Sequence, residues 1–324
     1  MTVLVTGAAG YIGSHAVLAL ADAGHDVVAV DDLSAGTRDL IPAAVPFVQA
    51  DIADEPTMGA ILRDHRVRAV LHFAGSISVG ESVRDPLRYY RNNVAGSAAL
   101  LAACVDAGVR SLVFSSTAAV YGAPDVTPIP ETAQLAPINP YGASKAMTER
   151  TLADVGAAHG LRWAALRYFN VAGADPQLRS GQAGGEVTHL IRRAVMAALG
   201  RASFAIHGDD YPTPDGTCVR DYVHVTDLVA AHLTVLDALA AGQSALTLNV
   251  GYGQGASVRD VVHAVERAAG HKLDAPIGRR RPGDPPTLVA DSTRLRRDFG
   301  WTPRFEDLDT IVASALAWER KRGG

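Results

Sequence analysis

A tyrosine and a lysine stand four residues apart in the stretch NPYGASKAM, Asn139 to Met147. Asn139 is a good helix N-cap and Pro140 suits the first helical position, so the stretch predicts the start of a helix. A spacing of four then places the Tyr141 phenol and the Lys145 ammonium on one face of that helix, one turn apart. The pair suits proton transfer, although a YxxxK match alone more often marks a packed tyrosine and a solvated lysine.

The chemistry open to this pair is removal of a proton from a hydroxyl group while a hydride leaves the carbon that bears this hydroxyl. A phenol of pKa about 10 is too weak a base near neutrality, and lowering its pKa by about three units requires about 4 kcal/mol. One ammonium at about 5 Å supplies about 3 kcal/mol at an effective dielectric constant of about 20. A positively charged nicotinamide would add a second cation. We therefore expect Tyr141 to be ionised by Lys145 and an oxidised nicotinamide together.

Hydroxyl groups follow the predicted strand in FSSTAAVYG, which contains Ser115, Ser116 and Thr117. A doubly wound sheet places its site at the carboxyl ends of its strands. One of these hydroxyls can hold the substrate oxygen, and we assign that role to Thr117. Ser115 is assigned to the cofactor side.

Glycines spaced as GxxGxxG, at Gly7, Gly10 and Gly13, lie between the first predicted strand and the first predicted helix. Such glycines allow a tight turn and close approach of a pyrophosphate, which the free N–H groups at the helix start stabilise. The next strand ends in Asp31, at the distance where an acid meets the adenosine ribose. With Asp32 beside it, a 2′-phosphate would face two negative charges, so NAD is favoured over NADP.

Other residues near this motif have weaker assignments. Tyr11 and Ile12 lie inside the motif and are expected to contact the cofactor. Arg38 would suit NADP, but in the polar loop LSAGTRD it is more often solvated. Asp51, followed by Ile52, is placed to meet the adenine edge, and a helix-capping role is an equal alternative.

The elements that must position these residues alternate along the chain. Short, nearly continuous apolar runs are typical of strands buried on both faces of a parallel sheet, and they read TVLVTG, DVVAVD, PFVQAD, RAVLHFAG, SLVFSST and WAALRYFNV. Helical patterns fill the gaps, including one over 86–108. The sequence predicts a doubly wound parallel α/β sheet over residues 1–170 and a smaller α/β lobe over 171–324. Some segments of the second range can return to the first domain.

Composition narrows the partners. The chain has 324 residues and a net charge of -4, without a basic stripe, so nucleic acid and anionic membranes are not expected as partners. No apolar run approaches the length of a membrane span, and a cytosolic location is expected. Cys104 and Cys218 fit buried thiols, and the spacing of the eleven histidines does not indicate a metal site.

Several blocks carry a resemblance to a known family. TGAAGYIGSH, the strand-end Ser/Thr, YGASK and RYFNVAGA resemble the extended short-chain dehydrogenase/reductases. HFAGSISVGES, YYRNNVAGS, GDDYPTPDGTCVRDYVHVTDL and RRRPGDPP are similar to the UDP-glucose 4-epimerases within that family. The similarity covers essentially the whole chain, and the last blocks are the most specific to sugar nucleotides.

The resemblance implies that a phenolate takes the proton of the sugar 4-hydroxyl while retained NAD accepts a hydride, after which the 4-keto sugar turns and is reduced on its other face. It assigns the base to Tyr141, its lysine to Lys145 and the sugar-oxygen contact to Thr117. It places near NAD the residues Phe73, Ala74, Gly75, Asn92 and Tyr168. It places at the UDP-sugar the residues Asn170, His189, Arg220, Arg281 and Asp284. Relatives form homodimers through helices that correspond to 86–108 and 139–159.

Some positions depart from the family pattern and leave alternatives open. Ile77 replaces a lysine, His207 replaces an aromatic residue near the uracil, His189 replaces an asparagine, and Leu288 replaces a tyrosine of some members. The shorter Leu288 leaves room beside the sugar 2-position, and we expect UDP-N-acetylglucosamine to be a secondary substrate at best. UDP-glucuronate or UDP-pentoses, a dehydrogenase that releases reduced cofactor, and a nucleotide sensor without catalysis remain alternatives.

Overall fold

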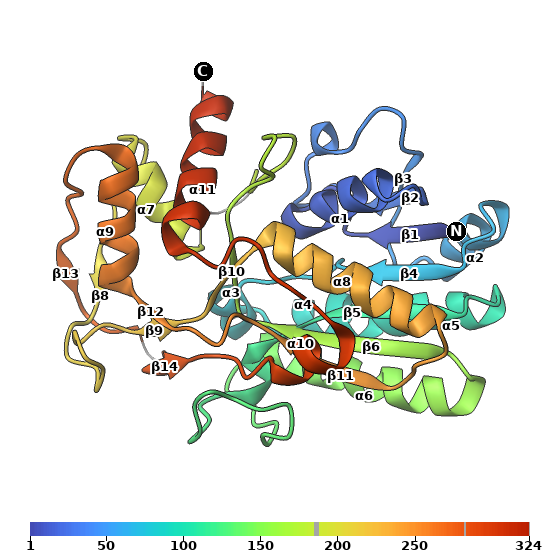
Figure 1. The fold of residues 1–324 in the computed structure, drawn as a ribbon. Coiled ribbons are helices and arrows are strands. Elements are labelled where there is room, and N and C mark those ends of the chain that lie inside the picture. Colours follow the sequence, from blue (N-terminus) through green and yellow to red (C-terminus); the bar gives the residue numbers. More distant parts are fainter. Residues whose placement is uncertain (185–187, 282, 324) are drawn as a thin grey trace.

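The computed structural model describes residues 1–184, 188–281 and 283–323. Its central sheet consists of β1 (Thr2–Thr6), β2 (Asp26–Asp31), β3 (Phe47–Gln49), β4 (Ala69–His72), β5 (Ser111–Thr117), β6 (Arg162–Tyr168) and β11 (Leu246–Val250). The strand order is β11-β6-β5-β4-β1-β2-β3, and every neighbouring pair is parallel (Figure 1). The predicted doubly wound fold is confirmed. Its order reverses between β1 and β4, where such sheets bind nucleotides.

Helices cover both faces of this sheet. One face carries α1 (Tyr11–Asp22) and α8 (Val225–Ala240), and the other carries α2 (Glu55–Asp64), α5 (Ser97–Asp106) and α6 (Pro140–His159). Successive side chains of a strand point to opposite faces, so Val3 and Val5 join the core under α1 and α8, whereas Leu4 joins the core under α2 and α5. Burial on both faces explains why apolar and polar residues do not alternate along these strands.

The helix predicted over 86–108 is one continuous segment with a change of winding. It starts as α4 (Pro86–Tyr89), widens into a π-helix, η2 (Tyr90–Gly96), and continues as α5. The short helix α3 (Val79–Arg84) precedes it. π-helical turns are rare in proteins, and those that do occur often lie at functional sites. The asparagines of η2 are therefore candidates for a role in the site.

A second group of elements stands to one side of the sheet, on the left of Figure 1. Its helices α7 (Leu190–Ala198), α9 (Val258–Ala269) and α11 (Leu308–Gly323) pack on one another. The short strands of the remaining small sheets are β7 (Asn170–Ala172), β8 (Ile206–His207), β9 (Val219–Arg220), β10 (Tyr222–His224), β12 (Ala256–Ser257), β13 (Ile277–Gly278) and β14 (Thr287–Leu288). The other short helices are η1 (Arg38–Leu40), η3 (Ala118–Tyr121) and α10 (Thr293–Phe299).

The sequence assigns 171–324 to a second lobe, with allowance for segments that return to the first. Two segments of that range, α8 and β11, lie on the central sheet. The division at residue 170 therefore stays a prediction about binding roles.

Among the described residues, no helix has both the length and the apolar character needed to cross a bilayer. Within those same ranges, no cluster of three or more His, Cys, Asp or Glu side chains is arranged to hold a metal ion. Cys104 and Cys218 are buried free thiols.

Candidate active site

The turn between β1 and α1 brings the glycine motif against the loop that follows β4. Gly7 has φ +65°, and a Cβ there would lie 2.6 Å from the backbone nitrogen of Ala74. A Cβ at Gly13 would overlap the carbonyl oxygen of Gly7. Helix α1 starts after Gly10, which provides no side-chain cap, so the N–H groups of its first turn are available to an anion. The turn therefore fits the pyrophosphate that the sequence predicts there.

Tyr11 and Ile12 occupy the first turn of α1. The Tyr11 hydroxyl donates to the carbonyl oxygen of Gly173 at 2.6 Å, and burial raises the pKa of this phenol well above its ordinary value. Ile12 is partly buried against the core. Both side chains are thus engaged by protein, and their predicted contact with a cofactor rests on backbone N–H groups.

Asp31 ends β2 and organises two turns. Its Oδ2 accepts the N–H of Ala9 at 2.9 Å and its Oδ1 accepts the N–H of Leu33 at 2.8 Å. Burial raises the pKa of this carboxyl, and the neighbouring Asp32 acts in the same direction, while the two hydrogen bonds lower it. The carboxylate retains lone pairs for a ribose hydroxyl, as expected for the acid of a dinucleotide site.

The residues with weaker assignments fall in different surroundings. The Arg38 guanidinium lies 4.7 Å from the ring centroid of Phe47, so this side chain is packed on a ring rather than simply solvated. Asp51 is exposed after β3, and Ile52 is buried. The cap of α2 is Asp54, which removes the alternative of a capping role for Asp51.

The loop after β4 contains the predicted cofactor residues Phe73, Ala74 and Gly75. Gly75 has φ +151°, and a Cβ at this position would lie 3.0 Å from a side-chain oxygen of η2. Asn92, in η2, donates through Nδ2 to the Ser76 hydroxyl at 2.9 Å. The structure thus brings these predicted residues together beside the glycine turn.

The start of α6 is as predicted. Pro140 is its first residue, and the Asn139 side chain accepts the N–H of Gly142 at 2.9 Å. Tyr141 and Lys145 follow on the first turns, so the cap fixes the direction in which both side chains leave the helix.

The Lys145 ammonium lies beneath the end of β5. Its Nζ donates to the carbonyl oxygen of Ser115 at 2.9 Å and lies 4.8 Å from the ring centroid of Phe114. The Ser115 hydroxyl is in hydrogen-bond contact with the Tyr168 hydroxyl. Thr117 is the last residue of β5, and its side chain is close enough to Tyr141 to lower the pKa of that phenol. The predicted catalytic group therefore converges at the carboxyl end of β5.

The charges of this group in the protein alone follow mainly from its burial. Burial raises the pKa of the Tyr141 phenol, and the Thr117 side chain opposes that shift. Burial lowers the pKa of Lys145 to about 8, and the Glu149 carboxylate acts in the opposite direction. Lys145 is thus a cation at neutral pH, and the predicted ionisation of Tyr141 depends on the second positive charge, that of the nicotinamide.

A buried ion pair that sequence reasoning missed lies one helical turn beyond Lys145. Glu149 and Arg167 approach to 2.5 Å, with both side chains 7% exposed. Glu149 also accepts the Ser116 hydroxyl, and Arg167 donates to the Tyr121 hydroxyl at 3.0 Å. We call Glu149, Arg167, Ser116 and Tyr121 the β5–β6 floor. The one signal in the sequence was Arg167 inside the apolar run of β6, which does not identify its partner.

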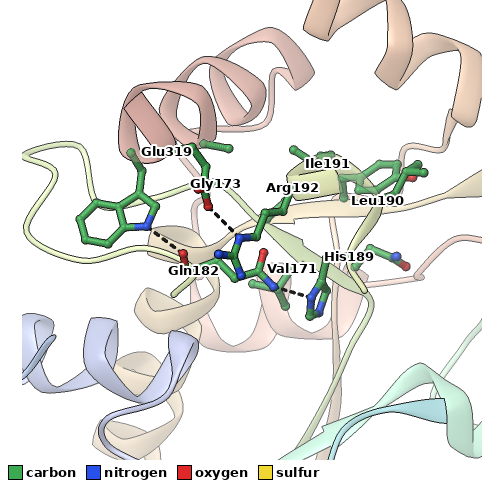
Figure 2. A pocket seen from close by; sticks show the side chains of 13 residues that line it. Val171, Gly173, Gln182, His189, Leu190, Ile191, Arg192 and Glu319 are labelled. Atoms are coloured by element: carbon green, nitrogen blue, oxygen red, sulfur yellow. Dashed lines mark hydrogen bonds and ion pairs between the residues drawn. The ribbon is translucent and has the colours of Figure 1, made fainter. Parts of the chain in front are cut away.

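A pocket is lined by two of the residues predicted to contact the substrate, Asn170 and His189. Figure 2 shows the Gln182 side chain directed at His189, with which it shares a hydrogen bond, and Arg192 directed at Glu319. Burial lowers the pKa of His189 to about 4, and Arg192 acts in the same direction. His189 is therefore a neutral hydrogen-bonding group.

A charged cluster lies on β9 and the segment before β14. Arg220 approaches Asp284 at 3.8 Å, and Arg220 is the neighbour of Leu288 in the β9–β14 register. Burial and the charge of Arg281 lower the pKa of His207, while Asp284 opposes the shift. The structure brings Arg220, Arg281 and Asp284 into one region. Pro282, in the same motif, lies outside the described residues.

Tyr222 links the pocket to this cluster and was missed in the sequence. It lines the pocket, pairs with Asn170 in the β10–β7 register, and has a buried hydroxyl without a hydrogen-bond partner among the described residues. Arg220 precedes it by two positions in CVRDYVH, and strand alternation from Arg220 was the signal that could have identified it.

Comparison with known proteins gives a consistent result. A model of the NAD dependent epimerase/dehydratase family matches residues 3–251. The UDP-glucose 4-epimerase of Azospirillum brasilense is 60% identical over 98% of this chain and 92% of its own length.

Solved structures agree over the same span. A UDP-glucose 4-epimerase from Stenotrophomonas maltophila, with bound NAD and formylated UDP-arabinopyranose, is 43% identical with a TM-score of 0.96, covering 100% of this chain and 99% of its own. The UDP-glucose 4-epimerase of Brucella ovis in complex with NAD is 44% identical with a TM-score of 0.95, covering 98% and 97%.

Proposed function

The chain belongs to the NAD dependent epimerase/dehydratase family, and from this premise we propose that it is an NAD-dependent isomerase that interconverts UDP-glucose and UDP-galactose at sugar C4. The observation that carries the proposal is the convergence of Thr117, Tyr141 and Lys145 at the carboxyl end of β5, beside the glycine turn. A nucleotide sensor would not need this group, because binding alone requires no base.

Three features of the fold support the assignment of NAD to this site. The glycine turn approaches the β4 loop too closely for side chains, the first turn of α1 lacks a side-chain cap, and Asp31 is held between two turns. We assign NAD to the residues Gly7, Gly10, Tyr11, Ile12, Gly13, Asp31, Asp51, Ile52, Phe73, Ala74, Gly75, Asn92, Ser115, Tyr141, Lys145 and Tyr168. When bound, NAD accepts a hydride from sugar C4 and returns it.

The residues of the chain handle the proton. Thr117 holds the sugar 4-oxygen, and Tyr141 removes its proton once positive charge lowers the pKa of the phenol. Lys145 supplies one such charge from its fixed place on the Ser115 carbonyl. In the return step Tyr141 gives the proton back to the same oxygen, so the enzyme ends in its starting protonation state.

The substrate nucleotide is assigned to the second lobe, over residues 171–324 together with Asn170. The Arg220 and Arg281 guanidinium groups suit a diphosphate, and the Asp284 carboxylate suits a ribose diol. Asn170 and neutral His189 offer hydrogen bonds in the adjoining pocket. Protection from hydrogen exchange in this lobe on addition of UDP would support the division of roles, and protection confined to residues 1–169 would contradict it.

The direct test uses purified protein, UDP-galactose and no added NAD. We expect UDP-glucose to appear, because the cofactor is retained and regenerated in each cycle. Product that requires added cofactor, with accumulation of reduced nicotinamide, would instead identify a dehydrogenase. UDP-N-acetylglucosamine is expected to turn over more slowly than UDP-galactose under the same conditions.

We propose that two copies of the chain pair through η2, α5 and α6. Leu87, before η2, is 60% exposed, and Met147, on α6, is 48% exposed, while Ala95 and Ala98 are exposed between the buried positions of their helix. Small side chains permit close helix contact. Light scattering is expected to show a dimer, and Met147→Asp to shift it toward monomer; a wild-type monomer at micromolar concentration would contradict the assignment.

A cytoplasmic location is proposed from the thiols. Cys104 and Cys218 are both free and buried, which suits a reducing compartment. Cell fractionation tests this location, and recovery of the native protein outside the cytoplasm would contradict it.

A further inference from the structure

Asn93, next to the predicted cofactor residue Asn92, makes a pair of contacts that its neighbour does not. Its side chain is buried, and its Oδ1 accepts the N–H of Ser76 at 2.8 Å while its Nδ2 donates to the carbonyl oxygen of Ser76 at 3.0 Å. The same Nδ2 donates to the Ser144 hydroxyl at 3.0 Å, and that hydroxyl donates to the carbonyl oxygen of Tyr141 at 2.7 Å. One amide thus joins the β4 loop to the first turn of the catalytic helix.

A second path leads from the same loop to the backbone of Asn93. The N–H of Ala74 donates to the Thr6 hydroxyl at 3.4 Å, and that hydroxyl lies 2.7 Å from His72 Nδ1. His72 Nε2 lies 2.9 Å from the Ser97 hydroxyl, which donates to the carbonyl oxygen of Asn93 at 2.6 Å. Because Ser97 uses its hydrogen on Asn93, His72 Nε2–H is the donor to Ser97, and Nδ1 accepts from Thr6. The loop is therefore held at both ends through one residue.

Two adjacent asparagines of the π-helix η2 contact different atoms of one loop residue. Asn92 meets the Ser76 hydroxyl and Asn93 meets the Ser76 backbone, although neighbours on an α-helix point about 100° apart. The fit is close, since a Cβ at Gly75 would lie 3.0 Å from Asn93 Oδ1 and 3.6 Å from Lys145 Nζ. Only a side chain with both a donor and an acceptor can pair with an N–H and a C=O of the same residue.

We propose that Asn93 is a positioning residue that sets the distance between the cofactor side of the site, at residues 73–76, and the base Tyr141. This inference rests on the function proposed above, in which a hydride leaves sugar C4 while a proton leaves the 4-oxygen, and each returns to the atom that it left. Asn93 acts through Ser76 and Ser144, and Asn92 keeps the role facing the cofactor.

Asn93→Leu tests the amide directly, because leucine has a similar volume and no polar group. We expect kcat per NAD-loaded site to fall about 100-fold, the loss associated with misplacement of reacting groups by about 1 Å, while KM for UDP-galactose changes less than about threefold. The NAD content of the purified variant is expected to match wild type, since the glycine turn and Asp31 are intact. Hydrogen exchange over 73–78 is expected to accelerate in the variant without cofactor.

A milder pair of variants separates positioning from folding. Ser144 and Ser82 are both fully buried, and each donates to the carbonyl oxygen three residues earlier at 2.7 Å, but of the two only Ser144 is contacted by Asn93. Ser144→Ala is expected to lower kcat per loaded site about fivefold, and Ser82→Ala less than about twofold. Comparable losses of thermal stability in the two variants would show that folding does not explain the difference in rate.

Two results would overturn the inference. One is a kcat per loaded site for Asn93→Leu within about twofold of wild type. The other is an equal loss of rate in Ser144→Ala and Ser82→Ala. Both are distinct from failure of the proposed function, which would appear in the wild-type protein as absence of UDP-glucose from UDP-galactose.

Discussion

Two ion pairs of this molecule differ in how completely the protein satisfies them. Glu149 and Arg167 in the β5–β6 floor meet at 2.5 Å, are 7% exposed, and share further hydrogen bonds with Ser116 and Tyr121. Arg220 and Asp284 stand 3.8 Å apart with side chains 12% and 39% exposed. Contacts within the protein satisfy the first pair, whereas the second pair leaves charge available to a ligand.

The difference matches two tasks of an epimerase. Atoms that exchange a proton and a hydride must hold fixed positions, and a buried pair with saturated hydrogen bonds favours that rigidity. The nucleotide must be held while its sugar turns and released afterwards, and a guanidinium 3.8 Å from its carboxylate can meet a diphosphate without first breaking a strong pair. The expectations below test this contrast, from the largest effect to the smallest.

Removal of the base should have the largest effect. Tyr141→Phe keeps the ring and deletes the hydroxyl, and we expect kcat to fall about 1,000-fold because general-base catalysis is lost. The purified variant should still contain its dinucleotide, measured after acid release. Full activity in this variant would remove the tyrosine from the mechanism.

Breaking the pair of Glu149 and Arg167 should be costly to the fold. Arg167→Met leaves a buried carboxylate unpaired, so we expect the free energy of unfolding to fall by about 3–5 kcal/mol in denaturant titrations. The matched control is Arg88→Met, which breaks the exposed pair of Arg88 and Glu81, whose side chains are 57% and 31% exposed. A change of less than about 1 kcal/mol is expected there. Equal effects of the two substitutions would remove the contrast in burial on which the comparison depends.

The pair of Arg220 and Asp284 should matter to substrate and little to stability. Arg220→Met is expected to raise KM for UDP-galactose about 10- to 100-fold, as for loss of a charge-assisted hydrogen bond, with a smaller change in kcat. Steady-state kinetics and a melting curve measure both quantities. A stability loss as large as that of Arg167→Met, with KM unchanged, would assign Arg220 to the fold instead.

A buried histidine on the rigid side gives the smallest expected effect near neutral pH, and its contribution appears only as pH falls. Burial lowers the pKa of His72 to about 3, and Lys145 acts in the same direction, so the folded state binds fewer protons than the unfolded state between about pH 3 and 6.5. The stability contribution is therefore complete above about pH 6.5 and is lost as pH falls, by about 1.4 kcal/mol per unit. Denaturant titrations from neutral pH downward should show a shallower slope in His72→Gln; an unchanged slope would contradict this account.

The sequence predicts most of the sheet and of the catalytic group because their signals are local. Apolar runs mark the strands, and Asn139 with Pro140 marks the start of α6 and hence the direction of Tyr141. By contrast, β11 is one short apolar run among several in the second half of the chain. Its place beside β6 depends on a pairing between segments about eighty residues apart.

The polar contacts behind the site were beyond prediction for a related reason. Helical spacing does not show that Asn92 and Asn93 both contact the β4 loop, because the two residues occupy adjacent positions of η2. The Glu149–Arg167 pair joins a helix to a strand, and neither residue's neighbours in sequence identify the other. Such contacts form only after distant segments have packed.

Asp31, the acid that we propose to meet the ribose of NAD, also has a structural role. Its oxygens already fasten the turn at Ala9 and the turn at Leu33. Exchanging this acid to admit a phosphorylated ribose would loosen both turns at once. Conversion to NADP use therefore calls for rebuilding the backbone here before any new cation is introduced.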